Sequence, residues 1–231
     1  SSFLVYSIIS RSPLKHMFLS ALNVFYRPLK PRGALQPIPN LEEAETFGVS
    51  HIREFTWKQL LDLEACTRCG RCQDHCPAHL TEKPLSPKKV ILDLRAHLHE
   101  KGKPLIWNQA PKENEEPRLA GELISQDTLW ACTFCLNCYE QCPVYISAFD
   151  KIIDMRRYLV LMETRYPSEL REVFRNMERR SNPWGVEKHL RSDWAQDLGV
   201  QTLAEDPNVE FLYYPGCFKG YDDRNKKVAI A

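Results

Sequence analysis

The stretches CTRCGRCQDHCP, at residues 66–77, and CTFCLNCYEQCP, at residues 132–143, decide the fold of this chain. Both follow the pattern C-x-x-C-x-x-C-x-x-x-C-P, and each cysteine of the second motif lies 66 positions after its counterpart in the first. Three thiolates on one tight loop can bind three iron corners of a cubane. The fourth cysteine, set before a proline, usually binds the other cluster. The two motifs therefore predict two [4Fe–4S] clusters.

Cross-ligation divides the eight motif cysteines into two sets, each with three cysteines from one motif and one from the other. The first cluster is expected on Cys66, Cys69, Cys72 and Cys142. The second cluster is expected on Cys132, Cys135, Cys138 and Cys76. His75 and His79 are expected at the surface or behind the ligands, because each cluster already has four thiolates.

Zinc and disulfide bonds are the alternative uses of so many cysteines. Zinc sites pair cysteines as C-x-x-C units separated by a spacer, and a triplet followed by x-x-x-C-P does not divide into such pairs. Disulfides would leave one of the nine cysteines over and would strain such dense loops. Reduced thiols place the chain in a reducing compartment, most simply a cytoplasm.

The composition is that of an ordinary globular protein, with an uneven distribution of charge. Of the 231 residues, 43% are hydrophobic and 26% are charged, and the formal net charge is +1. Residues 1–41 contain five cations and no acid, which leaves a net charge of −4 on the remainder. No apolar run approaches the ~20 residues that cross a bilayer. No Gly-rich phosphate loop and no Ser-His-Asp set is found. The basic residues are concentrated in the N-terminal arm without an aromatic base-stacking array, so no nucleic-acid partner is expected.

Four parts are expected along the chain. Residues 1–40 form a basic amphipathic arm and a proline-rich linker, able to lie on a membrane surface or to dock on a partner helix. Residues 41–181 form an α-helical ferredoxin-like domain, 182–206 a connecting segment, and 207–231 the start of a truncated second domain. The chain begins without methionine and stops 14 residues after Cys217, so we expect a processed or excised segment.

The clusters are expected in a mainly helical frame. Thr56 and Gln59 form a capping box for a helix that leads into the first motif. Ser86-Pro87 starts a second helix that closes at Gly102, and the polar residues 103–121 form a loop between the motifs. Further helices are expected at 146–165, 168–180 and 187–197, and a strand at 209–214.

Two matched cluster motifs in a helical frame resemble the iron–sulfur module of heterodisulfide reductase and of anaerobic glycerol-3-phosphate dehydrogenase. The order of the other segments is similar to a family of membrane-bound, heterodisulfide-reductase-like iron–sulfur oxidoreductases, in which a cytochrome b-like membrane domain precedes the module. The segments that carry this resemblance are HMFLSALNVFYRPLKPRGAL at 16–35, NPWG at 182–185 and Tyr214-Pro215-Gly216-Cys217. The haem-binding helices and the later cysteines of that family are not found in this stretch.

The resemblance implies a fold and a set of partners. The fold is an α-helical ferredoxin with two [4Fe–4S] clusters, followed by the beginning of an α/β cysteine-rich CCG domain. In the intact protein Cys217 would help to bind a further iron–sulfur centre. The implied partners are electron-transfer flavoprotein or another redox protein, a cytochrome b-like, quinone-reactive membrane domain, and the membrane surface. The implied location is the cytoplasmic face of a bacterial or archaeal cell membrane.

Electron transfer through the two clusters, between electron-transfer flavoprotein and (mena)quinone, is the expected function. One alternative is the iron–sulfur subunit of a soluble heterodisulfide-reductase-like or glycerol-3-phosphate or glycolate dehydrogenase-like complex, located in the cytoplasm. Another is an interaction protein whose metal centres only hold helices together. No catalytic substrate site is evident in the sequence, which is therefore expected to supply the electron-transfer portion of an oxidoreductase.

The two motifs differ in charge. Arg68 and Arg71 lie in the first motif, where the second has Phe134 and Asn137. Positive charge near a cluster stabilises an added electron, although two nearby acids oppose it here. The cluster on the first motif is therefore expected to be the more easily reduced.

Overall fold

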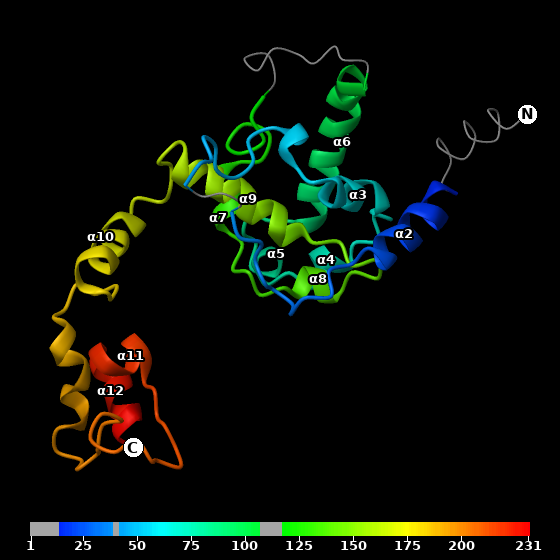
Figure 1. Cartoon of the computed structure of the whole chain (residues 1–231). Coiled ribbons are helices and arrows are strands. Elements are labelled where there is room, and N and C mark those ends of the chain that lie inside the picture. The colour runs from blue at the N-terminus through cyan, green and yellow to red at the C-terminus, as the bar shows by residue number, and fades with distance from the viewer. Residues whose placement is uncertain (1–13, 39–41, 107–116) are drawn as a thin grey trace, which may run out of the picture. The chain divides into compact units, whose positions relative to one another are not determined.

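The computed structural model describes residues 14–38, 42–106 and 117–231. The chain divides into two compact units, of which the first ends at Arg165 and the second begins at Tyr166. Figure 1 shows that both units are built from helices, and none of the residues that the structure describes forms a strand. The prediction of a mainly α fold is therefore confirmed.

The first unit carries both cysteine motifs in a repeated order of elements. A helix enters each cysteine loop, a short helix lies within the motif, and a longer helix leaves it. For the first motif these are α3 (Trp57–Ala65), α4 (Arg71–Asp74) and α6 (Pro87–Ile106), with the short α5 (Pro77–Leu80) before the last. For the second motif they are α7 (Gln126–Trp130), α8 (Asn137–Glu140) and α9 (Ala148–Leu161). They are preceded by α2 (Lys15–Phe25) and the 3-10 helix η1 (Ile52–Glu54).

Side-chain caps start the main helices where the sequence predicts them. Thr56 Oγ1 accepts from the backbone N–H of Gln59 at 3.3 Å, and Gln59 Oε1 accepts from the backbone N–H of Thr56 at 2.9 Å. This is the expected capping box. Ser86 and Ser147 accept in the same way from the N–H groups of residues 89 and 150, at the starts of α6 and α9. Such caps stabilise a helix by about 1 kcal/mol each.

The core of the first unit joins the two halves that carry the motifs. Leu63 of α3, Leu94 of α6, Leu129 of α7 and Leu159 of α9 are fully buried. Burying a leucine side chain contributes about 1.5–3 kcal/mol, so these contacts hold the halves together. α4 and α8 pack against each other, and this packing brings the two cysteine loops side by side (Figure 1).

A buried ionic network ties α2, α3 and α9 together. Lys151 of α9 is fully buried, and its Nζ donates to Asp62 Oδ2 at 2.7 Å. Lys58 Nζ donates to Asp62 Oδ1 at 2.6 Å and to Asn23 Oδ1 at 2.9 Å. Asn23 of α2 in turn donates to the carbonyl oxygen of Val144 at 2.8 Å. The described part of the arm is thus anchored beside the end of the second motif.

The second unit is organised around a tight turn. It contains α10 (Leu170–Arg180), the 3-10 helix η3 (Lys188–Ala195), α11 (Gly216–Tyr221) and α12 (Asp223–Ile230). The buried Asn182 closes the NPWG turn: its side chain accepts from the N–H of Val186 at 3.2 Å and donates to the Val186 carbonyl at 2.6 Å. Trp184 then packs edge-on against Phe218 of α11, with ring centroids 4.8 Å apart.

The prediction of a strand at 209–214 is wrong. These residues have no regular secondary structure, and Phe211 among them is 84% exposed. A strand is stable only when it pairs with others, and no strand is described anywhere in this unit. The α/β character expected for the start of a CCG domain is therefore not confirmed.

Some element boundaries also differ from the sequence-based expectation. α6 continues past Gly102 to Ile106, and the helix expected at 187–197 is a 3-10 helix. The helix expected at 168–180 begins the second unit instead of ending the first. Residues 1–13 of the arm and residues 107–116 of the loop between the motifs lie outside the described residues.

Candidate metal centre

The two cysteine loops have the same backbone conformation at equivalent positions. Arg68 and Phe134 have φ angles of 61° and 53°, and two residues later Gly70 and Leu136 have φ angles of 89° and 63°. Glycine adopts this left-handed backbone without strain, whereas a leucine there costs about 1–2 kcal/mol. The second loop thus keeps the backbone conformation of the first, although Leu136 is strained in it. Such retained strain is typical of a functional site.

The motif thiols surround two small cavities. One cavity is lined by Cys66, Cys69, Cys72 and Cys142, and Cys138 lines it as well. The other is lined by Cys76, Cys132, Cys135 and Cys138. Each cavity therefore brings together three cysteines of one motif and the fourth cysteine of the other, which is the grouping that cross-ligation requires.

Burial and mutual repulsion raise the pKa values of these thiols. Burial contributes most at Cys72, and the nearby Cys66 and Cys142 add to it, which raises the pKa of Cys72 to about 11. Burial followed by repulsion from Cys132 and Cys72 raises the pKa of Cys138 to about 12. Because Cys72 and Cys138 belong to different motifs, their interaction means that the two sets of thiols adjoin.

This donor set fits iron–sulfur clusters better than a single metal ion. Thiols with such high pKa values keep their protons unless a strongly cationic partner holds them as thiolates. Within the part of the chain that the structure describes, no three Cys, His, Asp or Glu side chains converge closely enough for one metal ion. Thiols spread around a cavity instead match the separate iron corners of a cubane.

One arginine donates a hydrogen bond to each cysteine loop at an equivalent position. Arg95 Nη1, on α6, donates to the carbonyl oxygen of Cys66 at 3.2 Å. Arg156 Nη2, on α9, donates to the carbonyl oxygen of Cys132 at 2.8 Å. Each guanidinium fixes the start of its loop. Its charge also lowers the pKa of that first cysteine, against the larger opposing effect of burial.

Sequence analysis missed both arginines, although the sequence contains a signal for them. Arg95 and Arg156 each lie nine positions after the serine that caps their helix. This serine-to-arginine spacing lies outside the cysteine motifs, so a comparison of the two motifs alone does not reveal it. The spacing does not predict which group each arginine contacts, because its contact with a cysteine carbonyl depends on how the helix packs on the loop.

The other residues singled out in the sequence lie away from the thiol cavities. His75 is exposed, and neither it nor His79 is among the residues that line the cavities, as expected. The carbonyl oxygen of His75 accepts from Asn137 Nδ2 at 2.5 Å, which links the two motifs. Cys217 is half-buried on α11 in the second unit, and its role as a ligand in the intact protein stays a prediction.

The comparisons with known proteins agree with this geometry. Residues 58–143, which include both cysteine motifs, match the 4Fe-4S dicluster domain. This part of the chain therefore belongs to the 4Fe-4S dicluster domains.

The chain is similar to parts of redox proteins of several kinds. It is 40% identical to the EtfAB:quinone oxidoreductase of Syntrophomonas wolfei, over 100% of this chain and 35% of the relative. It is 34% identical to a probable membrane-anchored ferredoxin of Chromohalobacter salexigens, over 99% of this chain and 37% of the relative. One subunit of the ferredoxin:CoB-CoM heterodisulfide reductase of Methanosarcina mazei is 30% identical, over 43% of this chain and 48% of the relative. The chain spans about a third of the length of the first two relatives.

Proposed function

We propose that this module passes electrons between electron-transfer flavoprotein and a quinone, as part of a longer membrane-associated oxidoreductase. The observation that carries the proposal is the adjoining pair of thiol cavities, which share Cys138. Similarity to an EtfAB:quinone oxidoreductase along the whole chain supports the choice of donor and acceptor. Bound in the two cavities, [4Fe–4S] clusters would take up and release one electron at a time.

The ligand assignment proposed for the clusters follows the cavities. Cys66, Cys69, Cys72 and Cys142 hold the first cluster, and Cys132, Cys135, Cys138 and Cys76 hold the second. In this arrangement the chain itself fixes the distance between the clusters, because each motif supplies a ligand to both. Arg95 and Arg156 hold the loops in place and supply positive charge, one for each cluster.

Cross-ligation can be tested by removing one cluster and then challenging the other. In the Cys66→Ser/Cys69→Ser/Cys72→Ser variant, the remaining cluster should need Cys76 and not Cys142. Adding Cys76→Ser should abolish the remaining four irons, whereas adding Cys142→Ser should leave them. The reverse result would show that each motif binds its own cluster. If the triple variant does not fold, single Cys76→Ser and Cys142→Ser variants, followed by EPR, distinguish which cluster each change perturbs.

Contact with the membrane is proposed to involve the outward face of α2. Phe18 and Phe25 on this helix are 59% and 78% exposed, whereas its Asn23 is anchored in the domain. The cations of the described arm contribute less than the sequence suggests. Lys15 pairs with Glu64, and Arg32 pairs with Glu140. Apolar burial, rather than attraction to anionic lipid, is therefore proposed to contribute most of the free energy of membrane binding.

No helix that the structure describes is long and apolar enough to cross a bilayer. The similarity to a membrane-anchored ferredoxin supports a location at a membrane. The soluble alternative, in which α2 packs on another subunit of a heterodisulfide-reductase-like complex, is favoured by the same exposed apolar face. Flotation of the protein with lipid vesicles separates these two locations, because only direct membrane contact carries the module to the vesicle fraction.

A further inference from the structure

Each set of thiols comes to the surface of the first unit at one cysteine. Cys69 and Cys135 are exposed, whereas the other six motif cysteines are buried or half-buried. Both exposed cysteines occupy the second position of their motif. A protein partner therefore approaches each set of thiols most closely at this cysteine, and the residues around it decide which partner is attracted.

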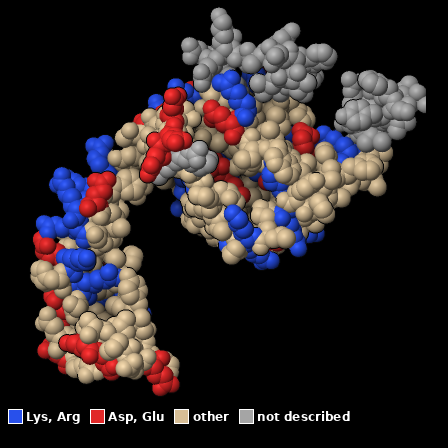
Figure 2. Space-filling view, in the orientation of Figure 1, with Lys and Arg blue, Asp and Glu red and all other residues tan. Residues whose placement is uncertain are grey.

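The edge around Cys69 is basic. Arg68 and Lys88 line the first thiol cavity together with Cys69, and Arg71 begins α4 two residues later. Arg68 and Arg71 are exposed, and Lys88 of α6 is half-buried. Lys88 Nζ lies 3.8 Å from where a Cβ on Gly70 would be, so it is close to the same loop. Figure 2 shows Lys and Arg side chains gathered on this edge, where α4 lies in Figure 1.

These three cations have no counter-ion among the described residues. Within that part of the chain, none of Arg68, Arg71 and Lys88 forms an ion pair. Asp74, which is exposed on α4, offsets one of their charges and leaves a net charge of +2. Glu64 is already held by an ion pair with α2. The edge can therefore pair with acidic groups of another molecule.

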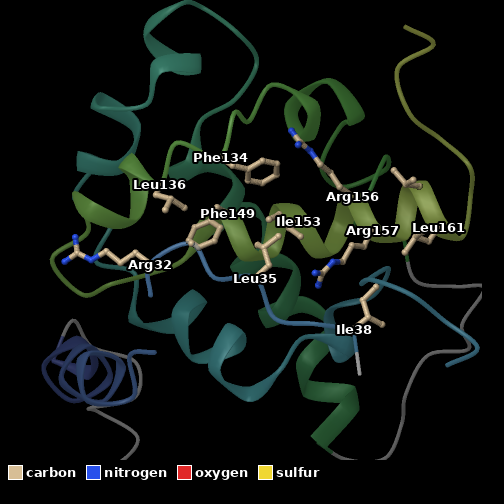
Figure 3. A pocket seen from close by; sticks show the side chains of 12 residues that line it. Arg32, Leu35, Ile38, Phe134, Leu136, Phe149, Ile153, Arg156, Arg157 and Leu161 are labelled. Atoms are coloured by element: carbon tan, nitrogen blue, oxygen red, sulfur yellow. The ribbon is translucent and has the colours of Figure 1, made fainter. Parts of the chain in front are cut away.

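The edge around Cys135 is apolar instead. Phe134 and Leu136 flank this cysteine in the sequence, and Figure 3 shows both in the lining of a pocket against α9. Arginines line the same pocket, but they are engaged within the fold. Ion pairs hold two of them, and a backbone carbonyl group of the second motif holds Arg156. Unpaired positive charge thus distinguishes the first edge from the second.

We propose that the basic edge around Cys69 is the docking surface for an acidic one-electron carrier protein. The proposal rests on the proposed function and adds which face of the module receives its protein partner and what charge that partner carries. In each encounter one electron leaves the carrier, which is oxidised, and reduces the cluster on the first motif. No bond and no proton is transferred.

The size and charge of this edge suit a brief encounter between redox proteins. Complementary charges on two proteins steer their approach and raise the association rate by about 10–10³-fold. Contacts between electron-transfer proteins are small and weak, as a patch on one loop and two helix ends would be. Anionic lipid would be attracted by the same charges, but the position of the charges beside an exposed thiol favours a partner that carries electrons.

Binding of oxidised flavodoxin, an acidic flavoprotein, tests the charge requirement without electron transfer. The anaerobically reconstituted protein, with its clusters oxidised, is titrated into isotope-labelled flavodoxin at low salt and followed by NMR. Arg68→Glu/Arg71→Glu should weaken binding at least tenfold, because it reverses two of the three charges. Arg68→Lys/Arg71→Lys keeps the charges and should bind as the wild type does. If the charge-reversed variant loses iron, Lys88→Glu replaces it, since this residue lies outside both motifs, and should weaken binding at least threefold.

The matched control is Arg171→Glu/Arg179→Glu, which reverses two exposed cations of α10 in the second unit. It changes the net charge of the protein by the same amount and should leave flavodoxin binding unchanged. Salt of about 1 M shortens the screening length to about 3 Å, so it should remove the difference between the wild type and the charge-reversed variant.

Three results would overturn the proposal: no flavodoxin binding by the wild type, equal binding by the wild type and the charge-reversed variant, or equally tight binding of the basic protein cytochrome c. Unchanged flavodoxin binding beside a loss of flotation with anionic vesicles would assign the edge to lipid instead. Failure of the proposed function is distinguishable by EPR of the same samples. Redox-active clusters without flavodoxin binding contradict the docking surface alone, whereas clusters that dithionite does not reduce contradict electron transfer even where flavodoxin binds.

Discussion

Asp62 is the residue on which the packing of α2, α3 and α9 most depends. It accepts from the two ammonium groups of Lys151 and Lys58, at 2.7 and 2.6 Å. The Asp62→Asn substitution would leave a buried lysine without its counter-charge, and such a loss costs about 3–5 kcal/mol. We expect this decrease in the free energy of unfolding, measured by urea denaturation. Asp93→Asn, which breaks a surface pair with Lys89, should cost under about 1 kcal/mol.

The same carboxylate predicts a pH dependence. Burial would raise the pKa of Asp62, but Lys151 and Lys58 outweigh burial, and the pKa lies below its ordinary value of 3.8. A pKa that is lower in the folded state stabilises the fold above the unfolded value, and this stabilisation is lost as the pH falls through the folded value. The stability difference between wild type and Asp62→Asn should therefore be full at pH 7 and shrink below about pH 4. A difference that stays constant down to pH 3 would contradict this assignment.

Among the described glycines, Gly48 is the one at which an added side chain would be most crowded. Its φ is +79°, and an added Cβ would lie 2.2 Å from the backbone N of Tyr158 and 2.4 Å from the carbonyl oxygen of Asp154. Backbone atoms of α9 cannot move aside cheaply, so Gly48→Ala should cost more than about 2 kcal/mol by urea denaturation. Gly121→Ala shares the positive φ but meets nothing closer than 3.8 Å, and should cost only the backbone strain of about 1–2 kcal/mol. Equal costs would contradict the steric argument.

At the scale of elements, the repeated loop and helix place one arginine beside each set of thiols. A difference in reduction potential between the two clusters must therefore come from other charges. Arg68 and Arg71 are exposed in the first motif, where the second has Phe134 and Asn137. A surface charge is worth about 1 kcal/mol at short range, and 59 mV corresponds to tenfold for one electron, so each charge shifts a potential by tens of millivolts. The Arg68→Ala/Arg71→Ala variant should lower the potential of the first-motif cluster by that order in an EPR-monitored titration.

The control for this prediction is Lys83→Ala/Lys89→Ala, which removes two exposed cations that do not line the thiol cavities. It should shift neither potential appreciably. If the arginine variant leaves the first-motif potential unchanged, the charge argument is wrong. A shift of tens of millivolts would not prevent electrons from moving between neighbouring clusters in either direction.

Local signals predicted most of the first unit, and packing decided what they missed. The capping box at Thr56 and the serine-proline start at 86–87 predicted α3 and α6, because caps and apolar stripes are encoded within a few residues. Arg95 and Arg156 were missed, since their roles depend on which loop packs against the helix. The apolar run at 209–214 was misread as a strand, because a strand also requires a neighbour that the run itself does not specify.

At the scale of the whole molecule, two surface features of the first unit are relevant to its partners. Figure 2 shows Lys and Arg side chains gathered on the edge of the first unit where α4 and α8 lie in Figure 1. The outward face of α2, by contrast, exposes Met17, Phe18 and Phe25. An exposed apolar patch of this kind marks a contact with a membrane or another protein.

The role of α2 is tested by flotation with anionic vesicles at low salt. The Phe18→Ser/Phe25→Ser variant should lose most of the binding that the wild-type segment shows, because both rings would otherwise insert at the headgroup boundary. Phe211→Ser/Leu212→Ser, which changes two exposed apolar residues of the second unit, should still float. A wild-type segment that stays unbound would contradict direct membrane contact by α2 and favour packing on another subunit.

Two redox-active cubanes in one module are the central claim. Iron and sulfide analysis of the anaerobically reconstituted protein, with EPR during a reductive titration, tests it most directly. We predict about eight irons and eight sulfides per chain, no zinc, and two one-electron reductions within roughly −700 to +450 mV. About four irons, zinc in their place, or clusters that stay silent throughout this range would contradict the account, and silent clusters would favour a structural role.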